Sequence, residues 1–317
     1  KPRLALRLGL AWRFAERAAS DALQRLLVAQ MRDWQADGRP VQFFSDLEAA
    51  ARTGAPLVHL LRDAWWLPDE PETGLAAPTS PTPITCFPSQ SCIRLHDTAS
   101  DTAVACKGGS TTANHGHLDC GQVVLVRAGR AILLDPGLAT YDAHTFGPER
   151  PRQAWIRAED HHVLRLDGHG PDPRPGHAAG PLQLTDNATH WQVVLDCAPA
   201  YDRALGITAY RRRLRFERDS GRLSWDDELD CPGSHALALD LLTADKPSHL
   251  DATTLLLGPA GAALRLCFDP GQWRLQLQPQ PLTDAGLASI WGPTLFRIRL
   301  RGQMQDRWRS RLELLPV

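Results

Sequence analysis

The chain has 317 residues, and its 35 basic and 36 acidic side chains give a formal charge of −1 at pH 7. With 43% hydrophobic and 22% charged residues, its composition is that of a folded globular protein and excludes a disordered or collagen-like chain. The near-zero charge gives no whole-molecule field that would favour nucleic acid or an anionic membrane as a partner. The length suggests about two domains.

The sequence contains no run of about 18 apolar residues, so we expect no membrane-spanning helix. No signal-peptide pattern is visible and the first residue is Lys1, which favours a mature form or a piece of a longer chain and leaves the localisation open. The 7 cysteines are an odd number without a C-x-x-C pair. This pattern predicts neither a disulfide framework nor a thiolate zinc site, and we expect most of these cysteines to be small buried residues.

Helical periodicity marks the beginning of the chain. Apolar residues recur at intervals of three and four between residues 4 and 34, which predicts one or two amphipathic helices. Ser45 and Glu48 resemble a capping box at the start of a short helix, and residues 56–66 form another helical stretch. A proline-rich connection follows. We therefore expect a short helical segment over residues 1–76.

From residue 77 onward the pattern is that of short strands separated by turns. Tyr210, Leu214 and Phe216 form one apolar face of such a strand, and only Arg212 interrupts that face. No helix is expected between the strands, so the sequence predicts a large antiparallel β-sandwich over residues 77–317, and an α+β fold class overall. The expected strands are Ser91–His96, Thr102–Lys107, Gln122–Arg127, Ala131–Leu134, His162–Leu166, His190–Leu195, Ala209–Glu217, Arg222–Leu229, Ala236–Leu242, Thr254–Leu257, Ala262–Phe268, Gln272–Gln278, Thr294–Arg301 and Trp308–Leu314.

The densest group of polar residues surrounds His115 and His117. Two histidines at positions i and i+2 of an extended segment point to the same side, and Asp135, at the end of the next strand, can approach them. His161 would complete a set of two nitrogen ligands and one oxygen ligand that suits Zn²⁺ with an open fourth position. A chain with 12 histidines can also contain one H-x-H pattern by chance.

One family pattern that matches these residues is the H-x-H-x-D motif of metallo-β-lactamase-like hydrolases. That motif would use Asp119, and it expects a histidine directly after this residue, where the chain has Cys120. It also expects an Asp-x-Gly strand end before the histidines, whereas Asp135-Pro136-Gly137 follows them. A zinc-dependent hydrolase is therefore the third hypothesis for this chain.

A second pattern fits more of the sequence. The run HGHLDCGQVVLVRAGRAILLDPGLATY resembles the core of the heparinase II/III-like domain of polysaccharide lyases, in which H-G-H-x-D, a strand, a turn, an apolar strand, D-P-G and a tyrosine follow one another. HHVLRLDG is similar to the later H-N-T-x-x-x-D-G run of that family, with His162 where asparagine is usual. FPSQSCIRL and YRRRLRFERDSGRLSWDDEL also fit. The resemblance covers about residues 84–245 in detail.

This resemblance implies an N-terminal (α/α) toroid packed on a C-terminal antiparallel β-sandwich, with the substrate groove between them. By motif position, His117, Asp135 and His161 would be zinc ligands, and the metal would mainly order the wall of the groove. His115 would face the substrate and take part in the chemistry. Whether His162 also binds the metal stays open.

The implied reaction is β-elimination at a 4-linked uronic acid of an acidic polysaccharide. A base removes the C5 proton while the neighbouring carboxylate is neutralised, and an acid protonates the departing O4. Arg157 could pair with uronate carboxylates or be a solvated loop charge, and Tyr141 could line the groove or pack locally. The substrate class favours a periplasmic or secreted location.

The helical segment departs from the family pattern. In these lyases a tyrosine and an asparagine or histidine of the toroid supply the acid and base, but residues 1–76 contain no tyrosine and only His59. The chain is therefore either a C-terminal part of a longer lyase or a member of a branch that has lost the elimination chemistry. The alternative from another class is a non-catalytic carbohydrate-binding or scaffold module that keeps the metal site.

Overall fold

The computed structural model describes residues 8–18, 20–21, 23–28, 83–113 and 115–317. The chain divides into two compact units, Lys1–Pro81 and Thr82–Val317. In the first unit, helix α1 (Leu8–Arg17) falls within the predicted helical stretch, and Trp12 and Ala15 are buried. The helices expected at Ser45 and over residues 56–66, and the predicted domain boundary, lie outside the described residues.

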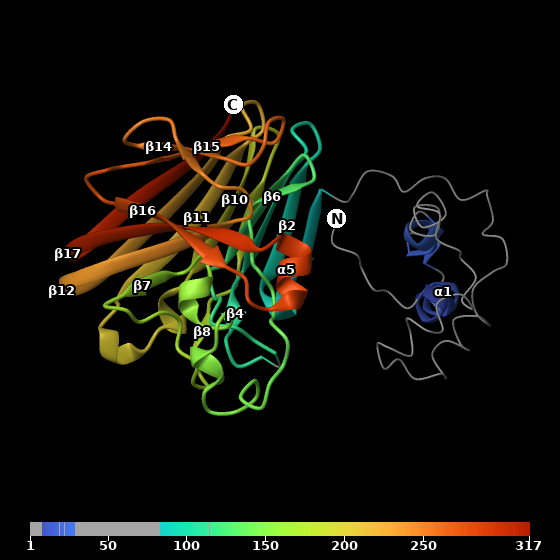
Figure 1. Ribbon diagram of the computed structural model, residues 1–317, viewed down its shortest axis with the longest axis horizontal. Helices are drawn as coiled ribbons and strands as arrows, with labels where there is room; N and C mark the ends of the chain where they lie inside the picture. The colour runs from blue at the N-terminus through green and yellow to red at the C-terminus, as the bar shows by residue number, and fades with distance from the viewer. Residues whose placement is uncertain (1–7, 19, 22, 29–82, 114) are drawn as a thin grey trace. The chain divides into compact units, whose positions relative to one another are not determined.

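The second unit is built from antiparallel strands, as predicted. Figure 1 labels most of them. Their bounds are β1 (Ile84–Phe87), β2 (Cys92–Asp97), β3 (Thr102–Lys107), β4 (Gly109–Ser110), β5 (Val123–Arg127), β6 (Arg130–Leu133), β7 (Leu164–Leu166), β8 (Ala178–Ala179), β9 (Gln183–Asp186), β10 (His190–Asp196), β11 (Ala209–Glu217), β12 (Leu223–Thr243), β13 (Ser248–His249), β14 (Thr254–Leu257), β15 (Leu264–Phe268), β16 (Arg274–Pro281) and β17 (Thr294–Pro316), with helix α5 (Ala285–Trp291) before the last strand.

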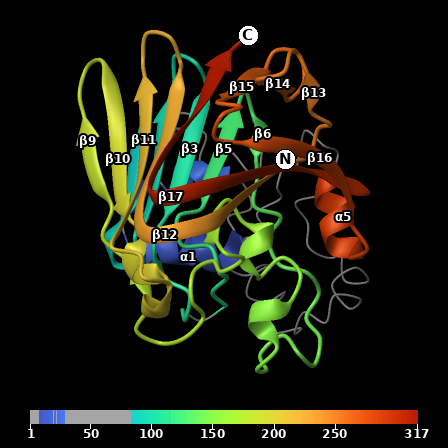
Figure 2. The ribbon, with the colours of Figure 1, turned by 90° about the vertical axis from the view of Figure 1, so that its left-hand side faces the viewer.

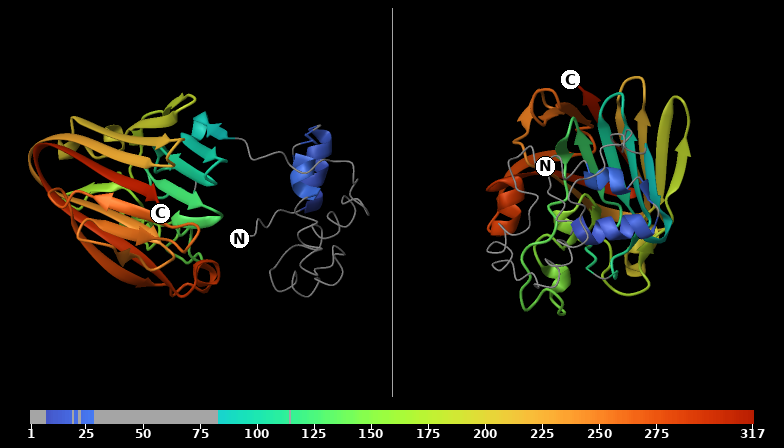
Figure 3. Two further views of the ribbon diagram at one scale, coloured as in Figure 1. Left: turned by 90° about the horizontal axis from the view of Figure 1, so that it is seen from above. Right: turned by 90° about the vertical axis from the view of Figure 1, so that its right-hand side faces the viewer.

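Two sheets pack face to face in this unit. One has five strands in the order β1-β2-β3-β5-β6, and the other has ten, with the path β13-β14-β15-β17-β12-β11-β10-β9 and the additional pairs β16–β17 and β7–β12. The left panel of Figure 3 shows them as two layers. Val104 and Leu125 of the first sheet share one buried core with Phe216 and Leu239 of the second. Burying each such side chain contributes about 1.5–3 kcal/mol, so this core confirms the predicted β-sandwich and accounts for its cohesion.

Strands β12 and β17 are each longer than the sequence predicts. Four separate strands were expected here, but each pair is joined into one, and the β12–β17 ladder continues across a register shift between Asp230 and Ser234. At this bulge Gly233 has a φ of 105°, and its N–H donates to Asp306 Oδ1 at 2.8 Å. Both strands bend in this region (Figure 2). The Pro232-Gly233 pair thus marks a bulge within a strand and not the end of one.

Helix α5 is not predicted by the sequence, which indicates no helix between the strands. Its N-cap is Asp284, whose Oδ1 accepts the N–H of Leu287 at 2.8 Å. At the other end, Trp291 Nε1 donates to the carbonyl oxygen of Pro136 at 2.9 Å. Because Pro136 follows Asp135, this helix supports the segment that presents one of the candidate metal ligands.

Two sequence-based expectations concern the cysteines and membrane-spanning helices. All seven cysteines are free thiols, and four of them, Cys106, Cys120, Cys197 and Cys231, are buried. Among the residues that the structure describes, no helix has the length and apolar character needed to cross a membrane.

Candidate metal centre and the histidine beside it

The H-G-H segment is a turn, so the expectation of an extended segment with both histidines on one side is wrong. His115 has a φ of 59°, a left-handed conformation that few residues other than glycine adopt. A Cβ atom at Gly116 would lie 2.6 Å from the carbonyl oxygen of Thr111 and 2.8 Å from that of Ala113, so only glycine fits there. This turn leaves His115 exposed and His117 half-buried.

Asp135 is held at the end of β6 by its own D-P-G turn. Gly137 has a φ of 84°, and its N–H donates to Asp135 Oδ1 at 2.8 Å. The second carboxylate oxygen, Oδ2, lies 3.1 Å from His161 Nδ1 and 3.4 Å from Gln122 Nε2. The side chains of His161 and Gln122, which come from two other segments of the chain, therefore orient the Asp135 carboxylate.

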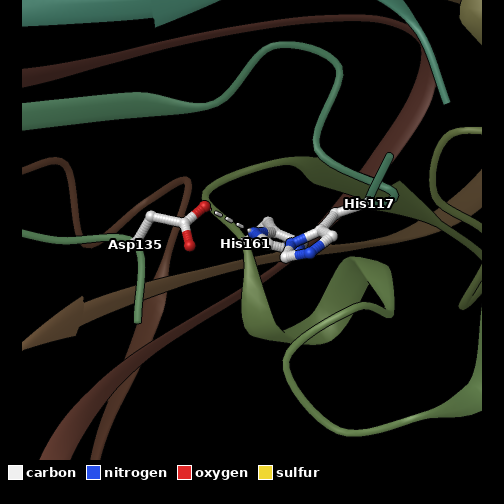
Figure 4. Close-up of side chains that lie close together, drawn as sticks. All are labelled: His117, Asp135 and His161. Atoms are coloured by element: carbon white, nitrogen blue, oxygen red, sulfur yellow. Dashed lines mark hydrogen bonds and ion pairs between the residues drawn. The ribbon is translucent and has the colours of Figure 1, made fainter. Parts of the chain in front are cut away.

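His117, Asp135 and His161 come together around one point (Figure 4). Each offers one ligand atom, and these atoms lie within 4.8 Å of one another. His161 is fully buried, and its Nε2 has no hydrogen-bond partner among the described residues. A buried polar atom without a partner is unfavourable unless something else satisfies it. Two imidazoles and one carboxylate form a donor set that fits Zn²⁺ with an open position.

The charges at this cluster suit a metal ligand set. Burial tends to raise the pKa of Asp135, but the hydrogen bond and charge of His161 outweigh it and lower that pKa to about 2. For His117, burial and then the neighbouring His161 lower the pKa, which favours the neutral imidazole that metal binding requires. For His161, burial acts to lower the pKa, but the hydrogen bond and charge of Asp135 raise it.

Asp160 fixes the chain just before His161. Its Oδ2 accepts the N–H of Trp155 at 2.8 Å and Arg157 Nε at 2.9 Å, and its Oδ1 accepts Arg297 Nη2 at 2.5 Å. Arg157, expected to pair with substrate carboxylates, is thus partly engaged by Asp160, while its side chain keeps 42% exposure.

Both ring nitrogens of His162 form hydrogen bonds within the fold. Its Nδ1 donates to the carbonyl oxygen of Val123 at 2.6 Å, and its Nε2 accepts the N–H of Leu242 at 2.9 Å. Burial lowers the pKa of His162 to about 4, which is consistent with a neutral ring in these two roles. With both ring nitrogens engaged, His162 has no atom left for a metal, which answers the question that the sequence left open.

His115 belongs to an exposed aromatic cluster. Its Nδ1 lies 2.9 Å from the hydroxyl oxygen of Tyr141, and the Phe146 ring centroid lies 5.4 Å from that of His115 and 5.2 Å from that of Tyr141. Tyr141 is 49% exposed and Phe146 is 63% exposed. Arg150 lies 5.5 Å from the Phe146 ring centroid and donates to the carbonyl oxygens of Thr145 and Gly116.

Sequence reasoning missed Phe146, Arg150 and Gln122. Phe146 and Arg150 lie in a loop without a family motif, so no spacing in the sequence points to them. The sequence pattern places Gln122 at the start of a strand, although a glutamine directly after the H-G-H-x-D-C-G run is a polar signal. Asp119, the acid of the metallohydrolase hypothesis, is instead paired with Lys107 and is not part of the ligand cluster.

The fold and this cluster define a class: an antiparallel β-sandwich domain with a two-histidine, one-aspartate candidate metal centre. The family model described as heparinase II/III-like, C-terminal, matches residues 81–293, and the chain belongs to this family. No curated protein matches the chain.

Solved structures of similar fold include heparinases. A heparinase III structure described with methylated lysines has 13% identity and a TM-score of 0.60 over 87% of this chain and 41% of its own. The heparan sulfate lyase HepC from Pedobacter heparinus has 12% identity and a TM-score of 0.60 over 86% of this chain and 41% of its own. A further heparinase III has 15% identity and a TM-score of 0.57 over 75% and 37%. At these identities the likeness concerns the fold, and the chain spans about two fifths of the length of these proteins.

Proposed function

We propose that the chain is the C-terminal sandwich part of a polysaccharide lyase that cleaves a uronate-containing acidic polysaccharide by β-elimination. The observation that carries this proposal is the exposed His115–Tyr141 pair, with its 2.9 Å hydrogen bond, presented by the same short segment that supplies His117 to the buried cluster. Membership of the heparinase II/III-like family supports the reaction class. Since such a polysaccharide is met outside the cell interior, we also propose a periplasmic or secreted location.

His115 is the residue that acts on the substrate in this proposal. Because Nδ1 faces Tyr141, Nε2 is the ring nitrogen left to hold or transfer a proton at a substrate atom. In the elimination, the C5–H and C4–O4 bonds break, a C4=C5 double bond forms, and a proton is delivered to O4. Arg150 and Arg157 lie close to each other in the sequence, in the loop that follows Phe146. Their positive charges can attract a negatively charged substrate.

We further propose that His117, Asp135 and His161 hold a zinc ion. Bound there, the ion would order the wall of the site and fix the three segments that carry these ligands against one another. The donor chemistry and the unpartnered Nε2 of His161 support this assignment. Two histidines and a carboxylate also suit Fe²⁺, so metal analysis has to decide the identity of the ion.

The activity test is the absorbance of unsaturated uronate on incubation of the chain with alginate, heparan sulfate or glucuronan. We expect a rise with one of these polymers, lost in His115→Ala and retained in His249→Ala, a control at an exposed histidine of β13. Binding without any rise in absorbance would favour the carbohydrate-binding module. Cleavage that leaves saturated ends would favour a hydrolase.

The metal test is independent of activity. Elemental analysis of the purified chain should find about one zinc ion per chain, and His117→Ala and His161→Ala should each lose it while His249→Ala keeps it. Addition of zinc to metal-free protein should raise its melting temperature, because a ligand that binds only the folded state stabilises it. Metal content that is equal in all these variants would contradict the ligand assignment.

A further inference from the structure

An array of arginines lies across four neighbouring strands of the ten-stranded sheet, in the order β7, β12, β17 and β16. In one row, Arg165 and Arg301 are both paired with Ala238 of the strand between them, and Arg274 is directly opposite Arg301. Residues directly opposite each other in antiparallel strands share a face of the sheet. The row therefore places three positive side chains on one face, interrupted only by an alanine.

Two further rows extend the array. The second contains Asp240, Arg299 and Gln276, and the third contains Leu242, Arg297 and Gln278. Figure 1 shows β16, β17, β12 and β7 beside one another. The exposed fraction of the arginine side chains rises along β17, from 2% at Arg297 to 32% at Arg299 and 40% at Arg301. The array is thus buried at one end and open to solvent at the other.

One buried carboxylate is surrounded by four of these guanidinium groups. Asp240 is 1% exposed and lies 2.6 Å from Arg165 Nη2, 2.9 Å from Arg301 Nη1, 3.6 Å from Arg297 Nη1 and 3.7 Å from Arg299 Nε. One carboxylate balances one guanidinium. Like charges opposite each other in a sheet are unfavourable, so this arrangement needs further negative charge.

The neighbouring acids supply only part of that charge. Glu159 lies 3.5 Å from Arg165, and Asp160 binds Arg297 but is shared with Arg157. Arg274 is exposed and has no ion pair with any described residue. In addition, the Nε atoms of Arg165, Arg297 and Arg299 and the Oε1 atom of Gln278 are buried without a hydrogen-bond partner among the described residues. The array therefore keeps an excess of positive charge together with unused hydrogen-bonding groups.

We infer that this array is a second polysaccharide-binding surface, which takes the carboxylate or sulfate groups of an acidic chain. Guanidinium groups bind such planar or tetrahedral oxyanions through paired hydrogen bonds. Arg165 is buried, so the groups open to solvent are those of Arg299 and Arg301 on β17 and Arg274 on β16. Neighbouring strands are about 4.8 Å apart and alternate residues of one strand about 7 Å apart, so these groups suit a polymer with repeated anionic groups better than one small anion.

The composition of the array favours a sugar polymer over a nucleic acid. The exposed Gln276 offers an amide for hydroxyl groups, and the three rows contain no aromatic side chain on which a base could stack. The choice of a polysaccharide rests on the proposed function, whereas the binding of an anion rests on the array alone. An experiment can therefore contradict the choice of a polysaccharide without contradicting the binding of an anion.

The test is calorimetric binding of heparan sulfate and alginate oligosaccharides to the full chain. Arg274→Gln/Arg301→Gln should weaken binding by at least about tenfold, and the affinity of the unsubstituted chain should fall steeply with salt. The matched control is Arg307→Gln/Arg309→Gln, which removes the same charge from the other half of β17, where Arg307 is 82% exposed. Arg274→Gln alone, which leaves the contacts of Asp240 intact, should weaken binding in the same direction if the double variant folds poorly.

Each outcome bears on the proposal. Binding that persists in His115→Ala and is lost in Arg274→Gln/Arg301→Gln supports a surface made by the array. Equal weakening by the control pair would overturn it, because the effect would then follow net charge alone. Binding of a short single-stranded DNA as tight as that of the oligosaccharides would overturn the polysaccharide assignment. A failed lyase assay with array binding intact would contradict the proposed function and leave this inference standing.

Discussion

Arg212 and Asp227 form a bidentate ion pair in the core of the sandwich. The arginine Nε and Nη2 atoms lie 2.8 Å and 2.7 Å from the two carboxylate oxygens. Both side chains are almost fully buried. Arg212 Nη1 also donates to the carbonyl oxygens of Gly121 and His162, each at 2.6 Å. Gly121 follows the H-G-H turn and His162 follows a candidate ligand, so one arginine joins two of the three segments that carry the candidate metal ligands.

Removal of either partner of this pair should destabilise the protein strongly. Arg212→Met leaves the Asp227 charge buried and two carbonyl oxygens without a donor, and Asp227→Asn leaves the arginine charge uncompensated. Breaking a buried pair costs about 3–5 kcal/mol, so urea unfolding should show a loss of this size in each variant. Arg152→Ala, which removes an 81% exposed partner of Glu149, should cost less than about 1 kcal/mol. Equal midpoints for the buried and exposed variants would contradict the assigned role.

The H-G-H turn should not tolerate a side chain at its centre. In Gly116→Ala the new Cβ would lie 2.6 Å from a backbone oxygen that cannot move independently, so the turn must shift. We expect a loss of about 1–3 kcal/mol in unfolding free energy and weaker zinc binding, because His117 moves with the turn. Gly147→Ala is the control, since a Cβ there meets only one oxygen at 3.7 Å. Unaltered zinc affinity in Gly116→Ala would show that the turn does not position His117.

Phe146 should contribute to substrate binding and not to folding. Its ring is 63% exposed beside His115 and Tyr141, so Phe146→Ala removes little buried surface. We expect oligosaccharide affinity or KM to worsen by about tenfold, equivalent to about 1.4 kcal/mol, with an unchanged melting temperature. Phe87→Ala changes the same residue type at 55% exposure in β1 and should leave both quantities unchanged. A lowered melting temperature with unaltered affinity would assign Phe146 to packing.

The sequence predicted the sandwich well because strand alternation and turn residues are local signals. Ala128 and Gly129 both have positive φ, as a two-residue hairpin turn requires, and the strands on either side fell where expected. The bulge at Gly233 was invisible, because only the pairing of β12 with β17 shows that the ladder continues past it. Likewise, Asp227, His162 and Gly121 accept hydrogen bonds from Arg212 across 15, 50 and 91 residues of chain, and no local pattern reports such contacts.

The candidate site was predicted only in part, because sequence patterns do not report the geometry that the folded chain gives to each residue. Family motifs pointed to His117, Asp135 and His161, which the fold brings together, but the local geometry assumed for His115 was that of a strand. His115 lies instead in a tight turn in which Gly116 comes close to Thr111 and Ala113, and the motif alone does not distinguish this turn from a strand. Tyr141 followed from its place in the motif, whereas Phe146 required the loop structure.

A histidine–aspartate pair between β12 and the end of β7 should make stability depend on pH. His235 Nδ1 lies 2.7 Å from Asp167 Oδ2, and this hydrogen bond, with that from His235 to the Pro232 carbonyl, raises the pKa of His235 above 6.5. Asp306 adds a favourable charge, and Cys231 Sγ lies 3.3 Å from Nε2. The bond from His235 lowers the pKa of Asp167 below 3.8.

The two shifts define the pH range in which the pair acts. A raised histidine pKa stabilises the fold fully below the unfolded-state value of about 6.5, and this contribution is lost as the pH rises through the folded-state pKa. A lowered aspartate pKa stabilises above about 3.9 and is lost as the pH falls. The contribution is therefore complete between about pH 4 and pH 6.5. Asp167→Asn should remove it, and Asn tolerates the φ of 50° found at this position.

Nuclear magnetic resonance titration of the imidazole protons measures this directly. In the unsubstituted chain the His235 resonance should titrate above pH 6.5. In Asp167→Asn the His235 titration should move down in pH, because the hydrogen bond that raises its pKa is weakened. Thermal melts should show the stability difference between the two proteins shrinking as the pH rises above about 6.5, because the deprotonated imidazole no longer forms an ion pair. An unaltered His235 titration in Asp167→Asn would rule out the pair as the cause of the shift.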